Sequence, residues 1–419
     1  MSIQSIEIKS GVNLHYIHTK KFKTTTLGFY FCRPLRREEA TLNALLPNVL
    51  KRACPLFPES IGLSRHLDNL YGAKLHAGVR KKGDLQVIHI NFEFINENYT
   101  GKSRPVLESI ISLAESAILG QTSFSKEYVA QEKENLKQYI QSQINDKRSY
   151  AATRCAEIMC AAEPYGINEH GFINDVDAID DNTLFTHYKS AFLSTPVEIF
   201  VCGDVDIFWV KQQIERIFSG VEPAGGKMPE MQIVKDVKEV KRVTETEQVA
   251  QGKLSLGFRT GIQPGDDAYP ALLVYNAAFG GGPSSKLFNN VRERLSLAYY
   301  ATSKIEMLKG LMMVNSGIEA SDFDKAYDEI MAQHLAVQNG DISDDEMSAA
   351  RLYTVNGIRS ISDNAFMTED YWLGRLIVGR LIELDELADC ISKVTKEDVM
   401  KIARNTVLDT VYFLKGGEA

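Results

Sequence analysis

The amino-acid sequence predicts an α+β fold made by tandem duplication of one unit, in which helices pack on an antiparallel sheet. Two observations support this prediction: short segments of the first half recur in the second half in the same order, and each half contains both strand-like and helix-like periodicity. The chain has 419 residues, enough for two or three domains of roughly 100–200 residues each. Its composition, 44% hydrophobic and 24% charged, is that of a globular protein.

Four pairs of matching segments define the repeat. The clearest pair is TTTLGFYF and GKLSLGFRT, centred on Gly28 and Gly257, and the other pairs begin at Ser64 and Ser285, Ser125 and Ser343, and Ile179 and Val394. The separation between matching positions decreases smoothly along the chain, which four chance matches would not do. We therefore expect an N-terminal domain over residues 1–220, a linker over 221–240 that includes VEPAGGKMPEM, and a C-terminal domain over 241–419.

Individual segments predict the elements of each unit. Residues 86–94 alternate between two sets, which predicts a half-buried antiparallel strand. The set expected in the core is Ile88, Ile90, Phe92 and Phe94, and the opposite set is Val87, His89, Asn91 and Glu93. Residues 125–143 predict a helix, because Ser125 can cap its N-terminus and Glu127 suits the dipole of its first turn. One further capped helix is predicted before the last strand of each repeat. The first begins at Asp180 and the second at Thr395.

Charge and composition exclude several classes of partner. The formal net charge is −8 and the pI is about 5.6, whereas nucleic acids and anionic membranes are bound by clustered positive charge. The short basic run at 80–82 is typical of a hairpin tip. The N-terminal stretch MSIQSIEIKS has no apolar signal core and no window approaches ~18 uninterrupted apolar residues, so we expect no membrane segment and a cytoplasmic location. The six cysteines include no Cys-x-x-Cys pair, and Cys155 and Cys160 are expected to be buried apolar residues.

The most specific motif lies between Phe279 and Tyr300, in FGGGPSSKLFNNVRERLSLAYY. Three glycines before a helix can cradle a phosphate, but the segment lacks the Lys-Ser/Thr of a P-loop and the dinucleotide-binding spacing. A flexible entry into a helix near Ser284 or Ser285 is the simpler structural interpretation. The order Gly-Gly-Gly-x-Ser-Ser-x-Leu-Phe, Val-Arg-Glu and Leu-Ala-Tyr is very similar to the second-domain signature of the pitrilysin, insulinase and processing-peptidase family. That resemblance implies a half-clamshell built from the duplicated unit.

The same resemblance implies a role for two residues of this segment. In such enzymes an Arg and a Tyr reach across to an active site beneath the first domain, bind the scissile carbonyl and stabilise the oxyanion. The matching positions here are Arg292 and Tyr299. The alternative is purely structural, with Arg292 in a surface ion pair and Tyr299 at the start of a strand.

The first domain of an active family member carries His-x-x-Glu-His, which places two zinc ligands one helical turn apart beside a general base. In this sequence Ala44 and Asn48 stand at the two ligand positions and Pro47 stands at the position of the base. The third ligand of the family is a Glu seven residues after another Glu; Glu132 matches the first, but Tyr139 occupies the ligand position. The resemblance therefore implies a lost zinc site, and we expect this chain to hold no metal and no other cofactor.

No other residues combine into a convincing metal site. His15 and His18 fall on a predicted strand, where a spacing of three places the two rings on opposite faces. None of the remaining histidines forms a pair at i, i+4 with a carboxylate beside it. The aspartates at positions 175, 177, 180 and 181 lack the glycine turn and closing Glu of an EF-hand, so a capped helix start explains them better.

Two functional hypotheses follow. In the first, the chain is a non-catalytic subunit that pairs with a zinc-bearing homologue, or with a second copy of itself, and contributes Arg292 and Tyr299 to peptide binding and oxyanion stabilisation. In the second, the chain is a peptidase that acts alone through an unrecognised or homodimeric metal site. The loss of the His–Glu constellation favours the first hypothesis, as does the resemblance to small bacterial homologues described as inactive metalloproteases. Zinc is then expected only in the partner subunit.

Overall fold

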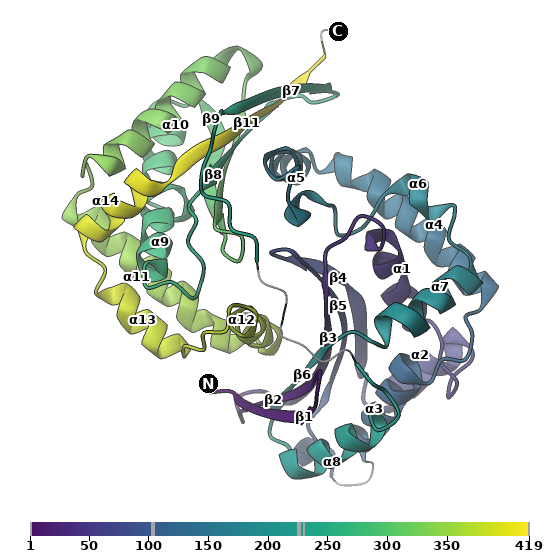
Figure 1. Ribbon diagram of the computed structural model, residues 1–419. Coiled ribbons are helices and arrows are strands. Elements are labelled where there is room, and N and C mark those ends of the chain that lie inside the picture. The colour runs from purple at the N-terminus through teal and green to yellow at the C-terminus, as the bar shows by residue number, and fades with distance from the viewer. Residues whose placement is uncertain (1, 102–104, 224–227, 229–230, 418–419) are drawn as a thin grey trace. The chain divides into compact units, whose positions relative to one another are not determined.

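The computed structural model describes residues 2–101, 105–223, 228 and 231–417. It confirms an α+β fold made from a duplicated unit, because each of two compact units contains one sheet with helices packed on it (Figure 1). Unit 1 comprises Met1–Gln141, Ile167–Pro229 and Ala365–Leu373. Unit 2 comprises Ser142–Gly166, Glu230–Asn364 and Gly374–Ala419.

The two sheets share one strand order. The sheet of unit 1 runs β1 (Gln4–Lys9), β2 (Val12–His18), β6 (Val197–Gly203), β3 (Thr24–Pro34), β5 (Leu85–Ile95) and β4 (Lys74–Lys82). The sheet of unit 2 runs β7 (Lys241–Glu247), β11 (Val407–Gly416), β8 (Gly252–Arg259), β10 (Leu311–Ile318) and β9 (Ala298–Glu306). Apart from the additional β1, the orders match strand for strand, with β2–β6 and β7–β11 parallel and the other neighbours antiparallel. The expected antiparallel sheet therefore contains one parallel pair in each unit.

Helices cover the sheets (Figure 1). The helices of unit 1 are α1 (Ala40–Leu50), α2 (Ser60–Asn69), α3 (Val106–Ala114), α4 (Lys126–Ser142, of which the last residue falls in unit 2), α6 (Ile173–Val176), α7 (Asp181–His187) and α8 (Ile207–Ile217). Those of unit 2 are α5 (Lys147–Met159), α9 (Tyr269–Asn276), α10 (Phe323–Gln338), α11 (Asp344–Ser360), α13 (Leu384–Ser392) and α14 (Lys396–Asn405). Helix α12 (Ala365–Val378) begins in unit 1 and ends in unit 2.

Packing groups the chain differently from the domains expected over 1–220 and 241–419. Ser142–Gly166 packs in unit 2 and Ala365–Leu373 packs in unit 1. The first segment contains α5 and the second is the first part of α12, and these two helices occupy equivalent places after α4 and α11. The two repeats therefore exchange one helical segment. Of the expected linker, residues 224–227, 229 and 230 lie outside the described residues, and residues 231–240 contain no helix or strand.

Gly28 and Gly257, the centre of the clearest sequence repeat, make room for the exchanged segments. The neighbours of Gly28, Leu27 and Phe29, point into the main core of unit 1, so Gly28 faces the other side of its sheet. A Cβ at Gly28 would lie 3.0 Å from Glu369 Oε2, and a Cβ at Gly257 would lie 2.6 Å from Met159 Sδ. Glycine at both positions lets a helical segment of the other repeat approach the sheet closely.

The strand predicted at residues 86–94 is β5, and it is antiparallel to β3 and β4. The face expected in the core does lie in the main core of unit 1. The expectation that the strand is half-buried is wrong for the opposite face, because Val87 is fully buried and Asn91 is 7% exposed. Glu369 of the exchanged segment lies against Gly28 on this second face, beside Asn91, where the sequence pattern alone predicted solvent.

The local signals of the sequence are confirmed. Helices α4, α7 and α14 lie where they were predicted, and Asp180 caps α7 by accepting from the Thr183 N–H at 2.7 Å. Thr395 and Asp398 form a capping box at the start of α14. The basic run at 80–82 ends β4 at a hairpin, as expected.

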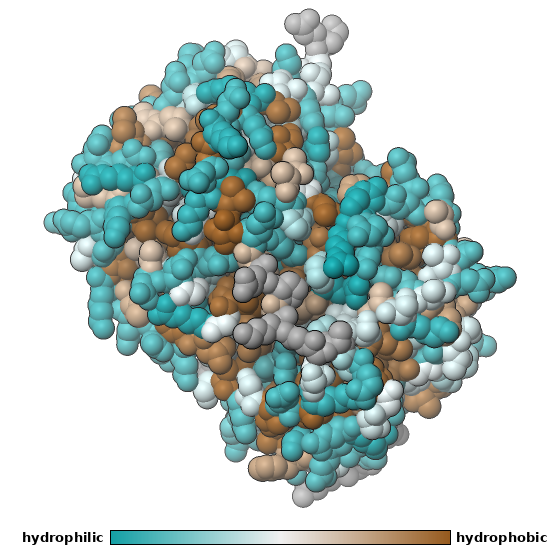
Figure 2. Space-filling model, in the orientation of Figure 1, coloured by the Kyte–Doolittle hydropathy of each residue, from teal (hydrophilic) through white to brown (hydrophobic). Residues whose placement is uncertain are grey.

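The burial of the cysteines and the character of the surface can also be compared with the sequence predictions. Cys155 and Cys160 are fully buried, as predicted, and Cys390 is exposed. On the face drawn in Figure 2, apolar residues are interspersed among hydrophilic ones. Within the part of the chain that the structure describes, no helix is long and apolar enough to cross a bilayer.

Candidate functional site

Helix α1 carries the degenerate zinc motif and lies in the core of unit 1. Ala44 is 1% exposed, and Leu45 and Leu46 are completely buried. Pro47 lies inside the helix, where its ring offers no N–H to the Asn43 carbonyl. Ala44 and Asn48 keep the one-turn spacing of two ligands on one helical face, but neither supplies an imidazole.

Asn48 is directed back to its own helix. Its Nδ2 donates to the Ala44 carbonyl at 3.0 Å, and Lys51 Nζ donates to its Oδ1 at 2.9 Å. A metal ion at this place would meet the ammonium charge of Lys51. Repulsion between unit charges about 4 Å apart is roughly 4 kcal/mol at an effective dielectric constant of about 20. The residues at these positions therefore do not fit zinc.

Tyr139 at the position of the third ligand, and Glu132 seven residues before it, are also engaged by other groups. Glu132 on α4 is 5% exposed, and its Oε1 lies 3.4 Å from Arg52 Nε, so its charge is paired inside unit 1. Tyr139 packs edge-to-face on His170, with ring centroids 4.6 Å apart and its hydroxyl 3.3 Å from Nε2. Among the described residues, no group of three or more His, Cys, Asp and Glu has metal-binding geometry.

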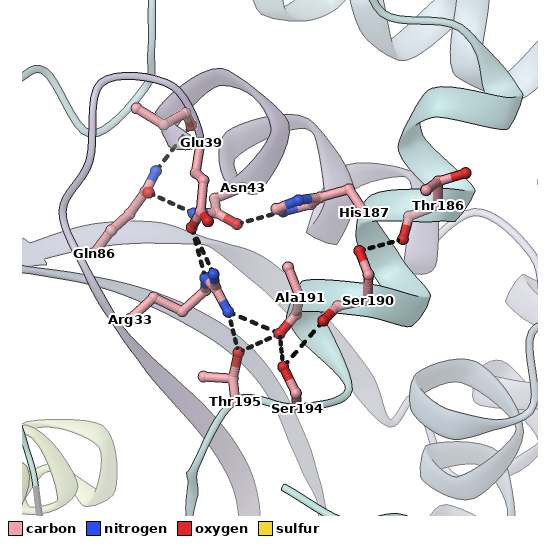
Figure 3. Close-up of polar contacts among 11 residues, drawn as sticks. Arg33, Glu39, Asn43, Gln86, Thr186, His187, Ser190, Ala191, Ser194 and Thr195 are labelled. Carbon is pink, nitrogen blue, oxygen red and sulfur yellow. Dashed lines mark hydrogen bonds and ion pairs between the residues drawn. The ribbon is translucent and has the colours of Figure 1, made fainter. Parts of the chain in front are cut away.

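A buried polar network fixes α1 beside the motif (Figure 3). Asn43, which is completely buried, donates to Gln86 Oε1 at 2.9 Å and accepts from His187 Nε2 at 2.8 Å. Burial, helped by the nearby Arg33, lowers the pKa of His187 to about 4, so its imidazole is neutral at pH 7. Arg33 in turn donates to Glu39 Oε2 at 3.1 and 2.5 Å. These contacts hold the helix in one position. The carboxylate of this network, Glu39, is paired with Arg33 and is therefore not available to bind a cation.

Arg292 and Tyr299 flank a tight turn in unit 2. Arg292 lies on the π-helical segment η7 (Leu287–Arg294), and Tyr299 is the second residue of β9. Between them Ser296 adopts the left-handed region with φ 51°, and the Leu297 N–H donates to the Val291 carbonyl at 3.0 Å. The turn fixes the start of β9 against the helical segment.

Both residues are exposed. The Arg292 side chain is 46% exposed, with Nε 3.6 Å from Glu293 Oε1 and the guanidinium 4.9 Å from the centroid of the Phe288 ring. Tyr299 is 60% exposed, and its hydroxyl lies 3.4 Å from Glu319 Oε1. The surface contacts expected if both residues are purely structural are thus present. They are long and exposed, and such contacts contribute about 0–1 kcal/mol to stability.

The glycine run before η7 is closely packed, so its interpretation as a flexible entry is wrong. Gly280 is buried, and a Cβ there would lie 2.7 Å from Leu287 Cδ1 and 2.8 Å from the Ser303 backbone N. Glycine is needed because the backbone of this segment touches β9. The helical segment begins near Ser284 or Ser285, as predicted: Lys286 is already helical, η7 follows from Leu287, and the Asn289 N–H donates to the Ser285 carbonyl at 2.9 Å.

The other metal candidates have structural roles. His15 is 2% exposed and the His18 side chain is 56% exposed, which confirms that the two rings lie on opposite faces of β2. Asp175 pairs with Arg37, and Asp177 Oδ1 lies 2.6 Å from Lys137 Nζ. Asp180 caps a helix, as the sequence pattern indicated, whereas the ion pairs of Asp175 and Asp177 were not predicted.

The second face of the unit 1 sheet carries a buried carboxylate that sequence reasoning missed. Glu369 is completely buried and accepts hydrogen bonds from the hydroxyls of Thr26 and Tyr30. Burial raises the pKa of Glu369 to about 7, although the two hydroxyls and Arg80 act in the opposite direction. The next residue, Asp370, lies 2.5 Å from Arg80 Nη1. Nothing in the sequence of α12 predicted that its first part packs on a polar face of the unit 1 sheet.

Glu369→Gln is expected to remove part of the pH dependence of stability. The pKa of Glu369 rises from 4.5 to about 7 on folding, so between these values the folded state holds the proton more tightly. This contribution is fully present below the unfolded pKa and is lost as the pH rises through 7, by roughly 3–4 kcal/mol. The variant should therefore gain stability relative to the natural protein by that amount between about pH 4.5 and 8.

Denaturant unfolding of both proteins across this pH range measures the difference. Comparing the two proteins cancels the opposite contribution of the buried His187, whose lowered pKa makes stability fall as the pH drops. Glu7→Gln, at an exposed position on β1, is the control and should leave the pH profile unchanged. A pH-independent difference for Glu369→Gln would contradict the prediction.

Comparison with known proteins gives concordant results. The family model for the peptidase M16 inactive domain matches residues 178–352. The chain is 39% identical to the "Probable inactive metalloprotease YmfF" of Bacillus subtilis, over 98% of both chains. It is also similar to the crystal structure of a conserved protein from Enterococcus faecalis, with 30% identity and a TM-score of 0.90 over 99% of each chain. A peptidase M16 inactive domain from Pseudomonas fluorescens shares the fold, with a TM-score of 0.80 at 15% identity over 100% of this chain and 99% of that chain.

Proposed function

This chain belongs to the M16 peptidase family as a homologue of a probable inactive metalloprotease, and from that premise we propose that it is a non-catalytic subunit that pairs with a zinc-bearing homologue. The partner supplies the metal and the general base. This chain supplies Arg292 and Tyr299, which bind the carbonyl of a peptide substrate and stabilise the oxyanion. One observation carries the proposal: the zinc-helix positions are engaged by other side chains, whereas Arg292 and Tyr299 remain exposed.

Arg292 and Tyr299 have the chemistry that this role needs. A guanidinium stays charged at every relevant pH, and a phenol donates one directed hydrogen bond. Both residues stand on regular backbone on either side of the Ser296 turn, so their positions are fixed relative to each other. Their present contacts at 3.6 and 3.4 Å are weak enough to be exchanged for a bond to a substrate oxygen.

The alternative is a peptidase that acts alone through its own or a homodimeric metal site. It would require imidazole or carboxylate ligands gathered at one place. The described residues offer no such group, and Asn48 and Glu132 are already paired with Lys51 and Arg52. The geometry therefore supports the subunit proposal better.

Metal analysis of the purified chain tests the first half of the proposal. We expect no stoichiometric zinc after dialysis against zinc-containing buffer, because the donor atoms are absent and Lys51 repels a cation. A matched positive control restores the ligands and the base and removes the ammonium, as A44H, P47E, N48H, Y139E and K51Q together. One tightly held zinc in the unaltered chain would contradict the proposal.

Mixing with a zinc-bearing homologue from the same source tests the second half. The homologue is recognised by His-x-x-Glu-His in its first domain. We expect the two chains to co-purify and peptide cleavage to appear only in the mixture. Cleavage by this chain alone, or co-purification only with copies of itself, would refute the pairing.

A further inference from the structure

Three side chains on neighbouring strands of the unit 1 sheet form one hydrogen-bonded chain. Ser5 on β1 and His15 on β2 are direct cross-strand partners, so their side chains project from the same face. Ser5 Oγ lies 2.8 Å from His15 Nδ1, and His15 Nε2 lies 2.5 Å from Glu198 Oε2 on β6. This face is the one opposite the main core, and the degenerate zinc helix α1 does not lie on it.

The carboxylate of Glu198 sets the direction of these hydrogen bonds. An ionised carboxylate can only accept, so a neutral imidazole at this place would carry its proton on Nε2 and leave Nδ1 as an acceptor. The Ser5 hydroxyl then donates to Nδ1, and its lone pairs remain available. Asn13 Nδ2 donates to the other oxygen of Glu198 at 3.1 Å and fixes the carboxylate. The arrangement has the order hydroxyl, base and orienting acid.

The three hydrogen-bonded residues differ in burial as catalysis requires, with an exposed hydroxyl and a buried base and acid. Ser5 is exposed, whereas the side chains of His15 and Glu198 are only 2% and 8% exposed. The Phe200 ring packs on the imidazole, with centroids 4.8 Å apart. The base is therefore largely shielded from water, whereas the exposed serine can contact an incoming ligand.

We propose that Ser5 is a nucleophile toward activated carboxylic esters, with His15 as its general base and Glu198 as a positioning residue. Ser5 Oγ attacks the ester carbonyl carbon while its proton passes to His15 Nδ1. The C–O bond to the alcohol breaks, and His15 returns the proton to the leaving oxygen. Water repeats these steps on the acyl-serine, which releases the acid and restores Ser5. Strand β1 is at the edge of its sheet, so alternate N–H groups on its outer side are not used by that sheet and can stabilise the oxyanion.

A fluorophosphonate probe tests the nucleophile directly. An activated serine forms an Oγ–P bond with the probe and expels fluoride, and its proton passes to the base. The full chain is incubated with the probe and the adduct is located by peptide mass spectrometry. We expect modification of Ser5 and its loss in Ser5→Ala, a change at an exposed position that leaves the core intact. Ser10, exposed in the turn between β1 and β2, is the internal control and should stay unmodified.

Glu198→Gln separates activation from simple exposure of a serine. Glutamine can donate to Nε2, which moves the imidazole proton to Nδ1 and removes the acceptor for Ser5. The labelling rate should fall by roughly 10²–10⁴-fold, the contribution of a general base. Nitrogen-15 spectra of the His15 ring should show the accompanying change of tautomer, and the fall in Ser5 labelling at an unchanged free energy of unfolding is what a merely structural role would not produce. No adduct in the natural protein, equal labelling of Ser10, an Nδ1–H tautomer in the natural protein, or unchanged labelling of Glu198→Gln would each overturn the proposal.

Discussion

Arg259→Met is expected to lower the free energy of unfolding of unit 2 by about 3–5 kcal/mol, the usual loss when one partner of a buried ion pair is removed. Arg259 is 4% exposed and lies between two buried carboxylates. Its Nη2 is 2.7 Å from Glu163 Oε1, and its Nε is 2.6 Å from Asp409 Oδ2. Glu163 keeps Lys309 Nζ at 2.8 Å in the variant, but Asp409 loses its cation in a place that water barely reaches.

The same cluster fixes the exchanged segment of unit 2. Glu163 belongs to Ser142–Gly166, and Arg259 Nη2 also donates to the carbonyl of Met159 at the end of α5. Removing the guanidinium should therefore loosen α5 from β8 before the rest of the unit unfolds. Hydrogen exchange in α5 is expected to accelerate more than exchange in α10, which packs elsewhere in the unit.

Denaturant unfolding with hydrogen exchange measures both effects. The control is Arg380→Met, because Arg380 pairs with Asp267 at 2.9 Å but their side chains are 50% and 95% exposed. That variant should change stability by no more than about 0.5 kcal/mol. Equal losses in the two variants, or exchange that accelerates evenly over the unit, would contradict the prediction.

The elements that the sequence predicted correctly are those whose signals are local. Capping residues such as Asp180 and Thr395 act on N–H groups two or three positions away, so their spacing can be seen directly. The alternation of β5 identified its core face for the same reason. The exchange of helical segments was not predictable, because the pattern of a strand shows which face is apolar and not which distant segment covers the other. Gly28 and Gly257 marked the repeat in the sequence, and only the structure shows that they admit those segments.

The candidate sites divide in the same way. The expectation that Ala44 and Asn48 stand at zinc-ligand positions came from the family resemblance, and it uses a local spacing, because a helix places positions four apart on one face. The contacts of Ser5, His15 and Glu198 were not visible, since His15 and Glu198 are 183 residues apart in the chain. The glycines at 280–282 predicted a flexible entry because a run of glycine is typical of loops, whereas here Gly280 allows the backbone to touch β9.

In a mixture with a zinc-bearing homologue, Arg292→Ala and Tyr299→Phe are each expected to lower peptidase activity by roughly 10²–10³-fold. Under the proposed function each removes a donor to the oxyanion, and loss of one such donor raises the barrier by about 2.7–4 kcal/mol. The donors act mainly in the transition state, so kcat should fall more than substrate binding. Because the side chains are 46% and 60% exposed, the stability of the chain should hardly change.

The matched control is Arg294→Ala, on the same helical segment as Arg292. Arg294 is 61% exposed and pairs with Glu329 at 3.1 Å, so its loss removes an equal charge at a neighbouring place. Binding of each variant to the partner is measured separately, which distinguishes a failure to pair from a failure of catalysis. Equal effects of Arg292→Ala and Arg294→Ala would indicate general electrostatics. Unchanged activity in Arg292→Ala and Tyr299→Phe would contradict the prediction. Arg292 would then have only its surface contact with Glu293, and Tyr299 only its structural place in β9.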